Sequence, residues 1–399
     1  MMKQAEQQNS KGASVARSES MQEAGSTNTG MQKQATGKQL VAIIFILALA
    51  TKMFLLPIFL IRSTGRDAYI IISVFCAFDL VTLGITLIAM RIADTDIFEL
   101  LSGVLGKVGS KIAVGMIGLF LFFKLNMSVA EILSFYGSNV FTDFDTSIMI
   151  IVLLAFFSAV GIHTLRALCR LNELLVPVIV VCLAVLVAIV AMTGFDLANI
   201  FPAVRNGKEF SSGIVRYSSW VGDFTPLVLF IGRTKTKKHT AVFATVSGVL
   251  GSAVAVFFAL VLSAAFGNTR SLVDSTTNLS NILQFTVGNV YGRLDMFSSI
   301  LWSVSVFVEA ALFFYSVCRC FAFIVEKNAN FAISVSLSGA MYIAQVFALV
   351  DPTVFSAVVT SPVCCIAVPI LTLSVPVLAL VCAAVTKKRG AGEKNETDG

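Results

Sequence analysis

The stretch Trp220-Val221-Gly222-Asp223-Phe224-Thr225-Pro226 lies inside an apolar run that extends from Ile214 to Ile231. A run of this length predicts a membrane helix, yet Asp223 stands between a glycine, which weakens helices, and a proline, which breaks them. A carboxylate in hydrocarbon is costly unless the backbone around it is unwound for a purpose. We therefore predict an interrupted helix. The alternative is that Asp223 marks a helix end at the membrane interface, with Pro226 beginning the next helix.

The composition around this stretch is typical of a polytopic membrane protein. Of the 399 residues, 57 % are apolar, only 13 % are charged, and 33 are Phe; the mean hydropathy is +0.88. A soluble domain needs far more polar surface than this. The net charge of +6 therefore gives no reason to expect nucleic acid as a partner, and the lipid bilayer is the expected surrounding.

The chain divides into a tail, a membrane domain and a second tail. Residues 1–37 are rich in Gln, Ser, Thr, Ala and Gly and predict a disordered cytoplasmic tail. Residues 38–386 predict a transporter-like transmembrane domain, and 387–399 a cytoplasmic tail. Apolar runs long enough to cross the ~30 Å hydrocarbon core predict an all-α fold with about ten transmembrane helices. Their approximate ranges are 39–61, 69–90, 111–134, 147–161, 174–192, 213–231, 241–266, 296–324, 331–350 and 354–385.

The positions of Lys and Arg predict the orientation of these helices. With the N-terminus inside, the cytoplasmic connections hold roughly twice as many Lys and Arg as the outer ones, as the positive-inside rule requires. The densest group runs from Arg233 to Lys238. Both termini are therefore expected in the cytoplasm.

Ten helices divide into five plus five, with repeat one at about 39–193 and repeat two at about 213–385. The first helix of each half carries helix-interrupting residues: Lys52 and Pro57 in one, Gly222 and Pro226 in the other. Interrupted helices at equivalent places are typical of transporters built from an inverted repeat. Half-helix ends expose amides and carbonyls at mid-membrane, which suits the carboxylate and ammonium of an amino acid.

Other ionisable residues lie deep in the predicted helices. Lys124 and Glu131 are seven residues apart and share one helix face. For Asp79 and Glu131, an interhelical ion pair or snorkelling toward an interface is as good an interpretation as ligand binding. Two cations and two anions at similar depth can neutralise one another, either in a ligand site or in a salt-bridged cluster with no ligand. These four are Lys52, Lys124, Asp223 and Glu309.

Motifs of soluble enzymes are missing from the sequence. The chain has only two histidines, His163 and His239, and neither a phosphate-binding loop nor a dinucleotide fingerprint. The eight cysteines lie almost entirely in apolar runs, where Cys behaves as a small hydrophobe. We expect no catalysis, no metal site and no cofactor.

Several blocks of sequence, in order and spacing, are similar to one known family. They are Gly65–Tyr69 (GRDAY), Asp96–Leu100 (DIFEL), Leu105–Lys107 (LGK), Gly161–Ala167 (GIHTLRA), Arg170–Pro177 (RLNELLVP), Asp196–Pro202 (DLANIFP), Arg293–Asp295 (RLD), Trp302 and Phe307. On these residues the chain resembles the B subunit of bacterial spore germinant receptors, within the amino acid–polyamine–organocation transporter superfamily. The likeness covers roughly residues 38–386.

The resemblance implies a receptor subunit in the bacterial cytoplasmic membrane, here the spore inner membrane. Such a subunit senses a small nutrient, usually an amino acid, and triggers germination together with an A-type subunit and a C-type lipoprotein subunit. The alternative is a proton-coupled amino acid permease. The family pocket lies among the first, third, sixth and eighth helices. By position, the ligand-binding residues are Ala50, Thr51, Lys52, Leu125, Ser128, Gly222, Asp223, Val308 and Glu309.

This sequence departs from the family at two places in the implied pocket. The segment Ala50-Thr51-Lys52-Met53 stands where the family usually has glycines, and Glu309 stands where it often has Lys or a small polar residue. The identity of the ligand is therefore open at this point.

Overall fold

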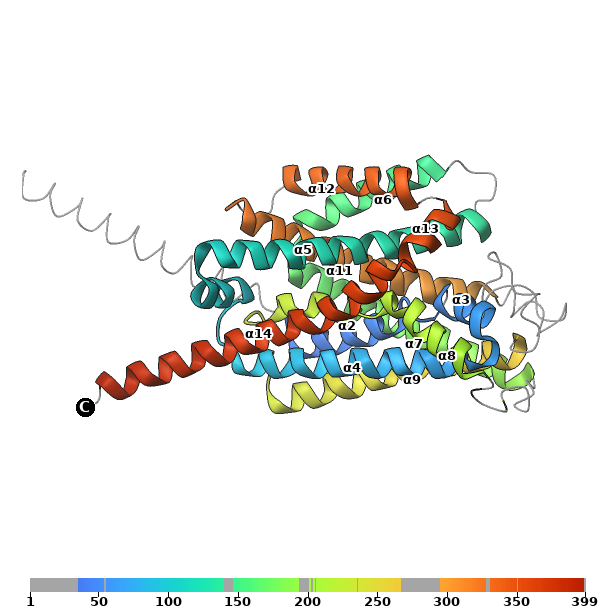
Figure 1. The fold of residues 1–399 in the computed structure, drawn as a ribbon, viewed down its shortest axis with the longest axis horizontal. Coiled ribbons are helices and arrows are strands. Elements are labelled where there is room, and N and C mark those ends of the chain that lie inside the picture. Colours follow the sequence, from blue (N-terminus) through green and yellow to red (C-terminus); the bar gives the residue numbers. More distant parts are fainter. Residues whose placement is uncertain are drawn as a thin grey trace, which may run out of the picture.

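The computed structural model describes residues 35–53, 55–139, 146–193, 201, 204, 206–234, 236–266, 295–327, 331–349 and 351–397. The regular secondary structure of these residues is helical, apart from one isolated parallel bridge between Ala35 and Thr234. The long helices lie side by side, roughly along the longest axis of the molecule (Figure 1). The prediction of an all-α fold is confirmed.

The helices of the described residues have the following bounds. In chain order they are α2 (Gly37–Leu49), α3 (Leu55–Thr64), the 3₁₀ turn η1 (Gly65–Asp67), α4 (Ala68–Ile92), α5 (Ile97–Asn139), α6 (Thr146–Ile162), α7 (Leu165–Thr193), α8 (Gly207–Arg216), the 3₁₀ helices η3 (Ser218–Trp220) and η4 (Thr225–Phe230), α9 (Lys238–Phe266), α11 (Asp295–Ile324), α12 (Phe331–Ala344), the π-helix η7 (Gln345–Leu349), α13 (Pro352–Val359) and α14 (Pro362–Thr397).

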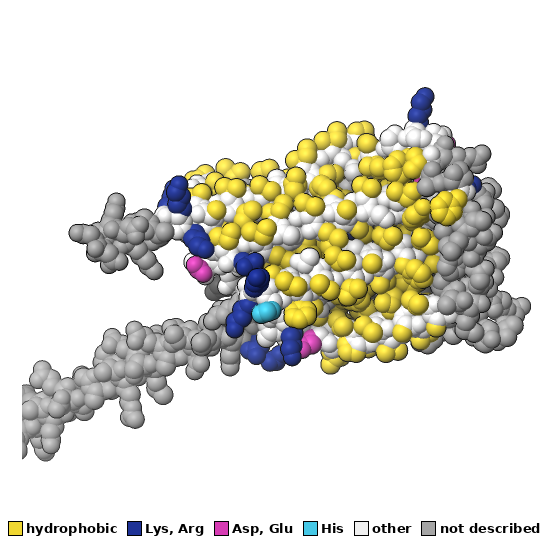
Figure 2. Space-filling model, turned by 90° about the horizontal axis from the view of Figure 1, so that it is seen from below, with side chains coloured by type: hydrophobic (Ala, Val, Ile, Leu, Met, Phe, Trp, Pro, Cys, Tyr) yellow, Lys and Arg dark blue, Asp and Glu magenta, His cyan; other side chains and the backbone are white. Residues whose placement is uncertain are grey.

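The surface of the bundle is that of a membrane protein. Within the described residues, six helical stretches are long and apolar enough to cross a bilayer: Leu55–Ile92, Ile97–Tyr136, Leu165–Ala188, Lys238–Ala264, Ile300–Ile324 and Pro362–Arg389. Apolar side chains cover most of the face in Figure 2, and most of the visible Lys and Arg side chains gather at one end of it. The total of ten spans and the five-plus-five repeat stay predictions.

The helix α11 lies at the centre of the bundle. Of its membrane span, 83 % is buried inside the protein, against 22 % for the span in α7. It packs along α5, α7 and α6, while α2 packs along α9 and α7. The Phe135 and Trp302 rings join α5 to α11 with their centroids 4.7 Å apart. A polar side chain on the inner face of α11 is therefore shielded from lipid by other helices.

The first predicted helix is interrupted, as its sequence indicates. α2 begins at a capping box in which Thr36 and Gln39 each satisfy the other's backbone amide. It ends at Leu49, the chain passes through a turn at Thr51–Met53, and α3 begins at Leu55. Pro57 lies in the first turn of α3, where a missing amide hydrogen is tolerated. The break thus places Lys52 outside regular helix.

The sixth predicted helix is interrupted over a longer stretch. α8 and η3 end at Trp220, the segment 221–224 is not helical, and η4 continues from Thr225 with Pro226 at its start. Asp223 lies in this non-helical segment. The predicted discontinuities of the first and sixth helices are therefore both present, and both breaks are buried.

Two other helices differ from the predicted spans. The stretch 354–385, expected as one helix, is divided between α13 and α14, because Pro362 begins a new helix whose first turn is capped by the Ser361 hydroxyl. Within α5, Gly106 has φ +73°, a left-handed conformation that separates an amphipathic turn from the long membrane helix.

Most of the predicted N-terminal tail lies outside the described residues, which begin at Ala35. Ala35 and Thr36 take part in the start of the bundle, through the bridge to Thr234 and the cap of α2. The C-terminal tail predicted at 387–399 continues α14 as far as Thr397.

Candidate functional site

The two helix breaks meet at a buried ion pair. The Lys52 ammonium, from the break between α2 and α3, binds Oδ2 of Asp223, from the break between η3 and η4. The Thr51 hydroxyl donates to the same Asp223 oxygen at 2.9 Å. Lys52 and Asp223 are 2 % and 0 % exposed, so this pair has no access to solvent. The interruptions therefore supply charged groups to one shared point.

A second carboxylate, Asp79 of α4, closes this arrangement from the other side. Its Oδ2 lies 2.6 Å from Lys52 Nζ, and its Oδ1 accepts the Gly222 backbone N–H at 2.8 Å. A backbone amide freed by unwinding would otherwise be unpaired in a membrane interior, which is costly. Asp79 thus stabilises both breaks at once.

Gly222 is required by the shape of the second break. Its φ of +107° lies in a region that residues with a side chain rarely adopt. A Cβ atom there would also lie 2.6 Å from the Thr372 hydroxyl of α14. The glycine lets the chain turn so that its amide meets Asp79 and the next side chain, Asp223, meets Lys52.

The helix α5 brings a second cation to Asp223. Lys124 Nζ lies 3.4 Å from Asp223 Oδ1 and is 1 % exposed. Leu125 and Ser128 are fully buried beside it, and the Ser128 hydroxyl donates to the Lys124 carbonyl at 3.2 Å. Both Asp223 oxygens therefore have cationic partners. Asp223 is occupied in holding the two breaks and α5 together.

Two further carboxylates lie near this cluster with free oxygens. Glu131, two turns beyond Lys124 on α5, accepts the Trp220 indole N–H at 2.9 Å through one oxygen, and its other oxygen has no hydrogen-bond partner. Neither oxygen of Glu309 on α11 has a partner. Both side chains are fully buried, and Glu309 lies within electrostatic range of Asp223, Lys124 and Glu131.

The buried charges do not balance when every group is ionised. Two ammonium groups face four carboxylates, all at most 2 % exposed: Lys52 and Lys124 against Asp79, Asp223, Glu131 and Glu309. An uncompensated charge in a membrane interior is strongly unfavourable. The excess of negative charge can therefore be neutralised by additional positive charge, either as protons or as a cationic ligand group. Glu131 and Glu309 have the oxygens that are still available to accept it.

The sequence model of spore germination proteins matches residues 34–351, which is most of the chain and contains every group of this cluster. The chain belongs to the spore germination protein family. No curated protein sequence matches it.

The fold of this spore germination protein is similar to that of a transporter. The structure of Mhp1, a nucleobase-cation-symport-1 family transporter in a closed conformation with bromovinylhydantoin bound, matches with a TM-score of 0.55. The match covers 91 % of this chain and 94 % of that chain, at 12 % identity. At this identity the likeness shows the fold alone, which is that of a transporter.

Of the nine residues that the resemblance assigns to the pocket of this spore germination protein, most lie at the cluster or directly beside it. Thr51, Lys52, Gly222 and Asp223 contact one another or Asp79. Ala50, Leu125 and Ser128 are buried and lie next to residues of the cluster. Glu309 lies within electrostatic range of the cluster. Val308 is different, since it lines a separate apolar cavity with Phe307 and Ser303.

Three residues outside that set prove to belong to the cluster. Asp79, Lys124 and Glu131 were recognisable as buried ionisable groups on the second and third helices, but an ion pair without a ligand role explained Asp79 and Glu131 equally well. The unwound Gly222 amide needs a hydrogen-bond acceptor, and this need would have pointed to a residue such as Asp79. The sequence alone does not say which helix faces the Gly222 amide. Within the described residues, no three His, Cys, Asp or Glu side chains are arranged to hold a metal ion.

Proposed function

We propose that this protein is the membrane subunit of a spore germinant receptor, and that it senses a small nutrient such as an amino acid rather than catalysing a reaction. One observation carries the proposal: in a chain of the spore germination family, two interrupted helices meet at a buried cluster that has unpaired carboxylates. Unpaired buried charge is rare unless a ligand or a proton completes it.

The ammonium group of the nutrient is assigned to Glu309 and Glu131. Three of their four carboxylate oxygens have no partner, and an ammonium group has three N–H donors to offer. Asp223, by contrast, is already bound by Lys52, Lys124 and the Thr51 hydroxyl. The nutrient carboxylate would face the backbone amides at the half-helix ends, where the helix dipole favours an anion.

Sensing follows from the way the cluster joins separate helices. A ligand that binds one arrangement of the broken helices better than another shifts the population toward it. A cation beside Glu309 would repel the Lys124 ammonium and attract the Asp223 carboxylate. The ion pair between Lys124 and Asp223 would therefore become weaker. The break at 221–224 could then move relative to α5 and pass the change to partner subunits.

The partners and location proposed are those of the receptor family: an A-type subunit and a C-type lipoprotein in the spore inner membrane. Both termini are assigned to the cytoplasm. The clustering of Lys and Arg at one end of the apolar surface supports this orientation, because the C-terminal helix α14 leaves the bundle at the same end (Figures 1 and 2). Genes for A-type and C-type subunits beside this one would support the assignment.

The test is a germination dose–response in a spore-former that carries Glu309→Gln. Loss of one charge-assisted contact of about 1.5–3 kcal/mol should raise the half-maximal nutrient concentration by roughly 10- to 100-fold. Glu326→Gln, an exposed carboxylate beyond the end of α11, is the matched control and should leave the response unchanged. An unaltered response of Glu309→Gln at a normal protein level would remove Glu309 from the nutrient site.

A second candidate is a proton-coupled amino acid permease. Lys52 favours it, because its ammonium lies between the two breaks, a position where a transporter could hold a coupling cation, and the fold is that of a transporter. Purified protein in liposomes should then take up labelled amino acid faster when a proton gradient is imposed, and Lys52→Met should abolish the dependence on the gradient. Nutrient binding without uptake would favour the sensor.

A further inference from the structure

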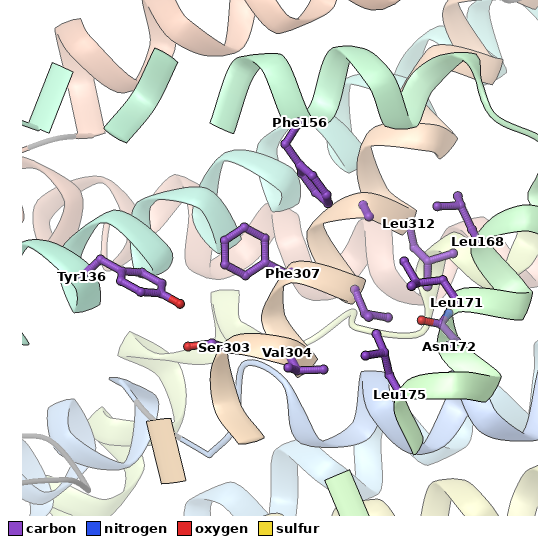
Figure 3. Close-up of a pocket in the computed structure, with 12 residues that line it drawn as sticks. Tyr136, Phe156, Leu168, Leu171, Asn172, Leu175, Ser303, Val304, Phe307 and Leu312 are labelled. Carbon is purple, nitrogen blue, oxygen red and sulfur yellow. The ribbon is translucent and has the colours of Figure 1, made fainter. Parts of the chain in front are cut away.

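A cavity of about 300 Å³ lies between α5, α6, α7 and α11, on the side of α11 away from the charged cluster. Apolar side chains form most of its wall (Figure 3), and the Phe156 and Phe307 rings meet edge to face with their centroids 5.8 Å apart. Leu168, Leu171 and Leu175 line it from α7, and α11 lines it from Ser303 to Leu312. The cavity is separate from the proposed nutrient site and contains none of its charged groups.

The wall of the cavity follows α11 over more than two helical turns. Its wall on α11 covers nine residue steps, which extend over ~14 Å along a helix axis. A volume of about 300 Å³ is at the lower end of the range for small-molecule sites and therefore limits the ligand to a small one. A neighbouring cavity of about 270 Å³ shares Tyr136 and Phe307 as walls and is apolar as well.

One polar side chain inside the cavity has no partner. The Asn172 amide is 2 % exposed, and it forms no side-chain hydrogen bond within the part of the chain that the structure describes. Leaving a buried amide without a hydrogen-bond partner is unfavourable. Ser303 adds a hydroxyl toward the opposite end (Figure 3). An apolar ligand alone would leave the Asn172 amide unsatisfied.

Charge and access limit the ligand further. None of the 12 lining side chains is charged, so an ionised ligand such as an amino acid would be uncompensated here. Phe156 and Leu171, 38 % and 46 % exposed, line the cavity and also belong to the outer surface of the bundle. Their neighbours Val152 and Leu174 are still more exposed and apolar, as lipid-facing residues are. The cavity thus opens toward the bilayer.

We propose that this cavity binds a neutral single-chain amphiphile, an alkyl chain ending in a hydroxyl or amide group, which enters from the membrane and hydrogen-bonds to Asn172. A lipid with two chains and an ionic headgroup exceeds the volume and offers charge where the wall has none. Val308 lines this cavity and Glu309, the next residue, belongs to the charged cluster. An occupied cavity therefore restrains the segment of α11 that carries Glu309.

The test uses the full chain in lipid nanodiscs and a photoreactive decanol that carries a diazirine in its alkyl chain. Illumination should label peptides that contain 168–175 of α7 and 303–312 of α11. Unlabelled decanol should compete, whereas decylammonium and decanoate should not. Asn172→Leu, which keeps the size of the side chain and removes its amide, should weaken competition by decanol about fivefold, the value of one hydrogen bond of about 1 kcal/mol.

Ala311→Phe supplies an independent check, because Ala311 is buried in the cavity wall and a phenyl ring there fills the space. Labelling of both segments should be lost. Leu119→Phe is the control, since Leu119 is 71 % exposed on α5 and does not line the cavity. Labelling that spreads evenly over lipid-facing helices, or that persists in Ala311→Phe, would overturn the proposal. So would labelling by a diacyl lipid probe that decanol does not displace.

Discussion

Lys52 Nζ lies 2.6 Å from Oδ2 of Asp79, and this pair fastens the break of the first helix to α4. The other Asp79 oxygen binds the Gly222 amide, so that one carboxylate restrains both interrupted helices. In a transporter fold the interrupted helices are the parts expected to move relative to the rest. The polar contacts of Asp79 are therefore a restraint on conformational change as well as on folding.

Replacing Lys52 by Met should destabilise the protein more than any surface change. Asp79 and Asp223 would lose a shared cation in a site without water, and breaking a buried ion pair in this way costs about 3–5 kcal/mol. The measurement is thermal unfolding in detergent. The double variant Lys52→Met/Asp79→Asn should recover part of the loss, while Lys327→Met, an exposed lysine, should change little. Equal losses in the single and double variants would mean that Asp79 does not depend on Lys52.

Gly222→Ala should distort the second break. The positive φ and the close Thr372 hydroxyl together predict a cost of about 1–3 kcal/mol. Thr372→Ala in the same chain should restore only part of the stability, because it relieves the contact and leaves the backbone strain. Gly84→Ala is the control, since a Cβ at Gly84 in α4 meets no atom within 4 Å. Full recovery in the double variant would show that the backbone conformation is not limiting.

The contact between Arg233 and Asp96 should stabilise the end of the sixth predicted helix that follows η4. The Arg233 guanidinium donates to Asp96 at 2.7 Å through Nε and lies over the Phe98 ring. Both charged side chains are partly exposed, so Asp96→Asn is expected to cost about 1 kcal/mol. Amide exchange of the segment 94–100 should rise about fivefold, measured by hydrogen–deuterium exchange. Asp94→Asn, an exposed neighbour, provides the comparison. An unchanged exchange rate would mean that this ion pair does not hold the segment.

The exposed Glu326, which pairs with Lys107 and Lys111 just beyond α11, should have a low pKa. Hydrogen bonds from Lys111 and Lys107 lower the pKa of Glu326 from its ordinary 4.5 to about 2. A depressed carboxyl pKa contributes stability above pH 4.5 that is lost as the pH falls toward 2. Because Glu326 is exposed, solvent and salt weaken the effect. A carboxyl NMR titration should give the low value, and Lys111→Gln should raise it toward 4.5. A titration of the unmodified chain near 4.5 would contradict the pairing.

The fold was predictable to the extent that apolar length and helix-breaking residues determine it. Both interruptions follow from local chemistry, Lys52 before Pro57 and Asp223 before Pro226, because each places a charged side chain and a proline in an apolar run. The division of the last helix at Pro362 follows from the same rule, yet a single helix over 354–385 was expected. A proline at a helix start and one inside a helix look alike until the cap at Ser361 is seen.

The site was predictable in its helices but less so in its pairings. Val308 and Glu309 are adjacent in sequence, but neighbours on a helix point about 100° apart, so one lines the apolar cavity and the other approaches the charged cluster. The pairing of Asp79 with the Gly222 amide joins residues 143 positions apart. Nothing local specifies such a contact, because it depends on the rotation of α4 within the bundle.

The winding of η4 has a geometric consequence for motion. Thr225–Phe230 forms a 3₁₀ helix, which rises about 2.0 Å per residue, whereas an α-helix rises about 1.5 Å. If these six residues change from 3₁₀ to α-helical geometry, the segment shortens by about 3 Å. One end of it adjoins Asp223 and the other leads to Arg233, so rewinding would draw the buried cluster and the Arg233–Asp96 ion pair closer together. The sixth predicted helix can thus change in length by a fixed amount, which is set by the difference in rise between a 3₁₀ helix and an α-helix.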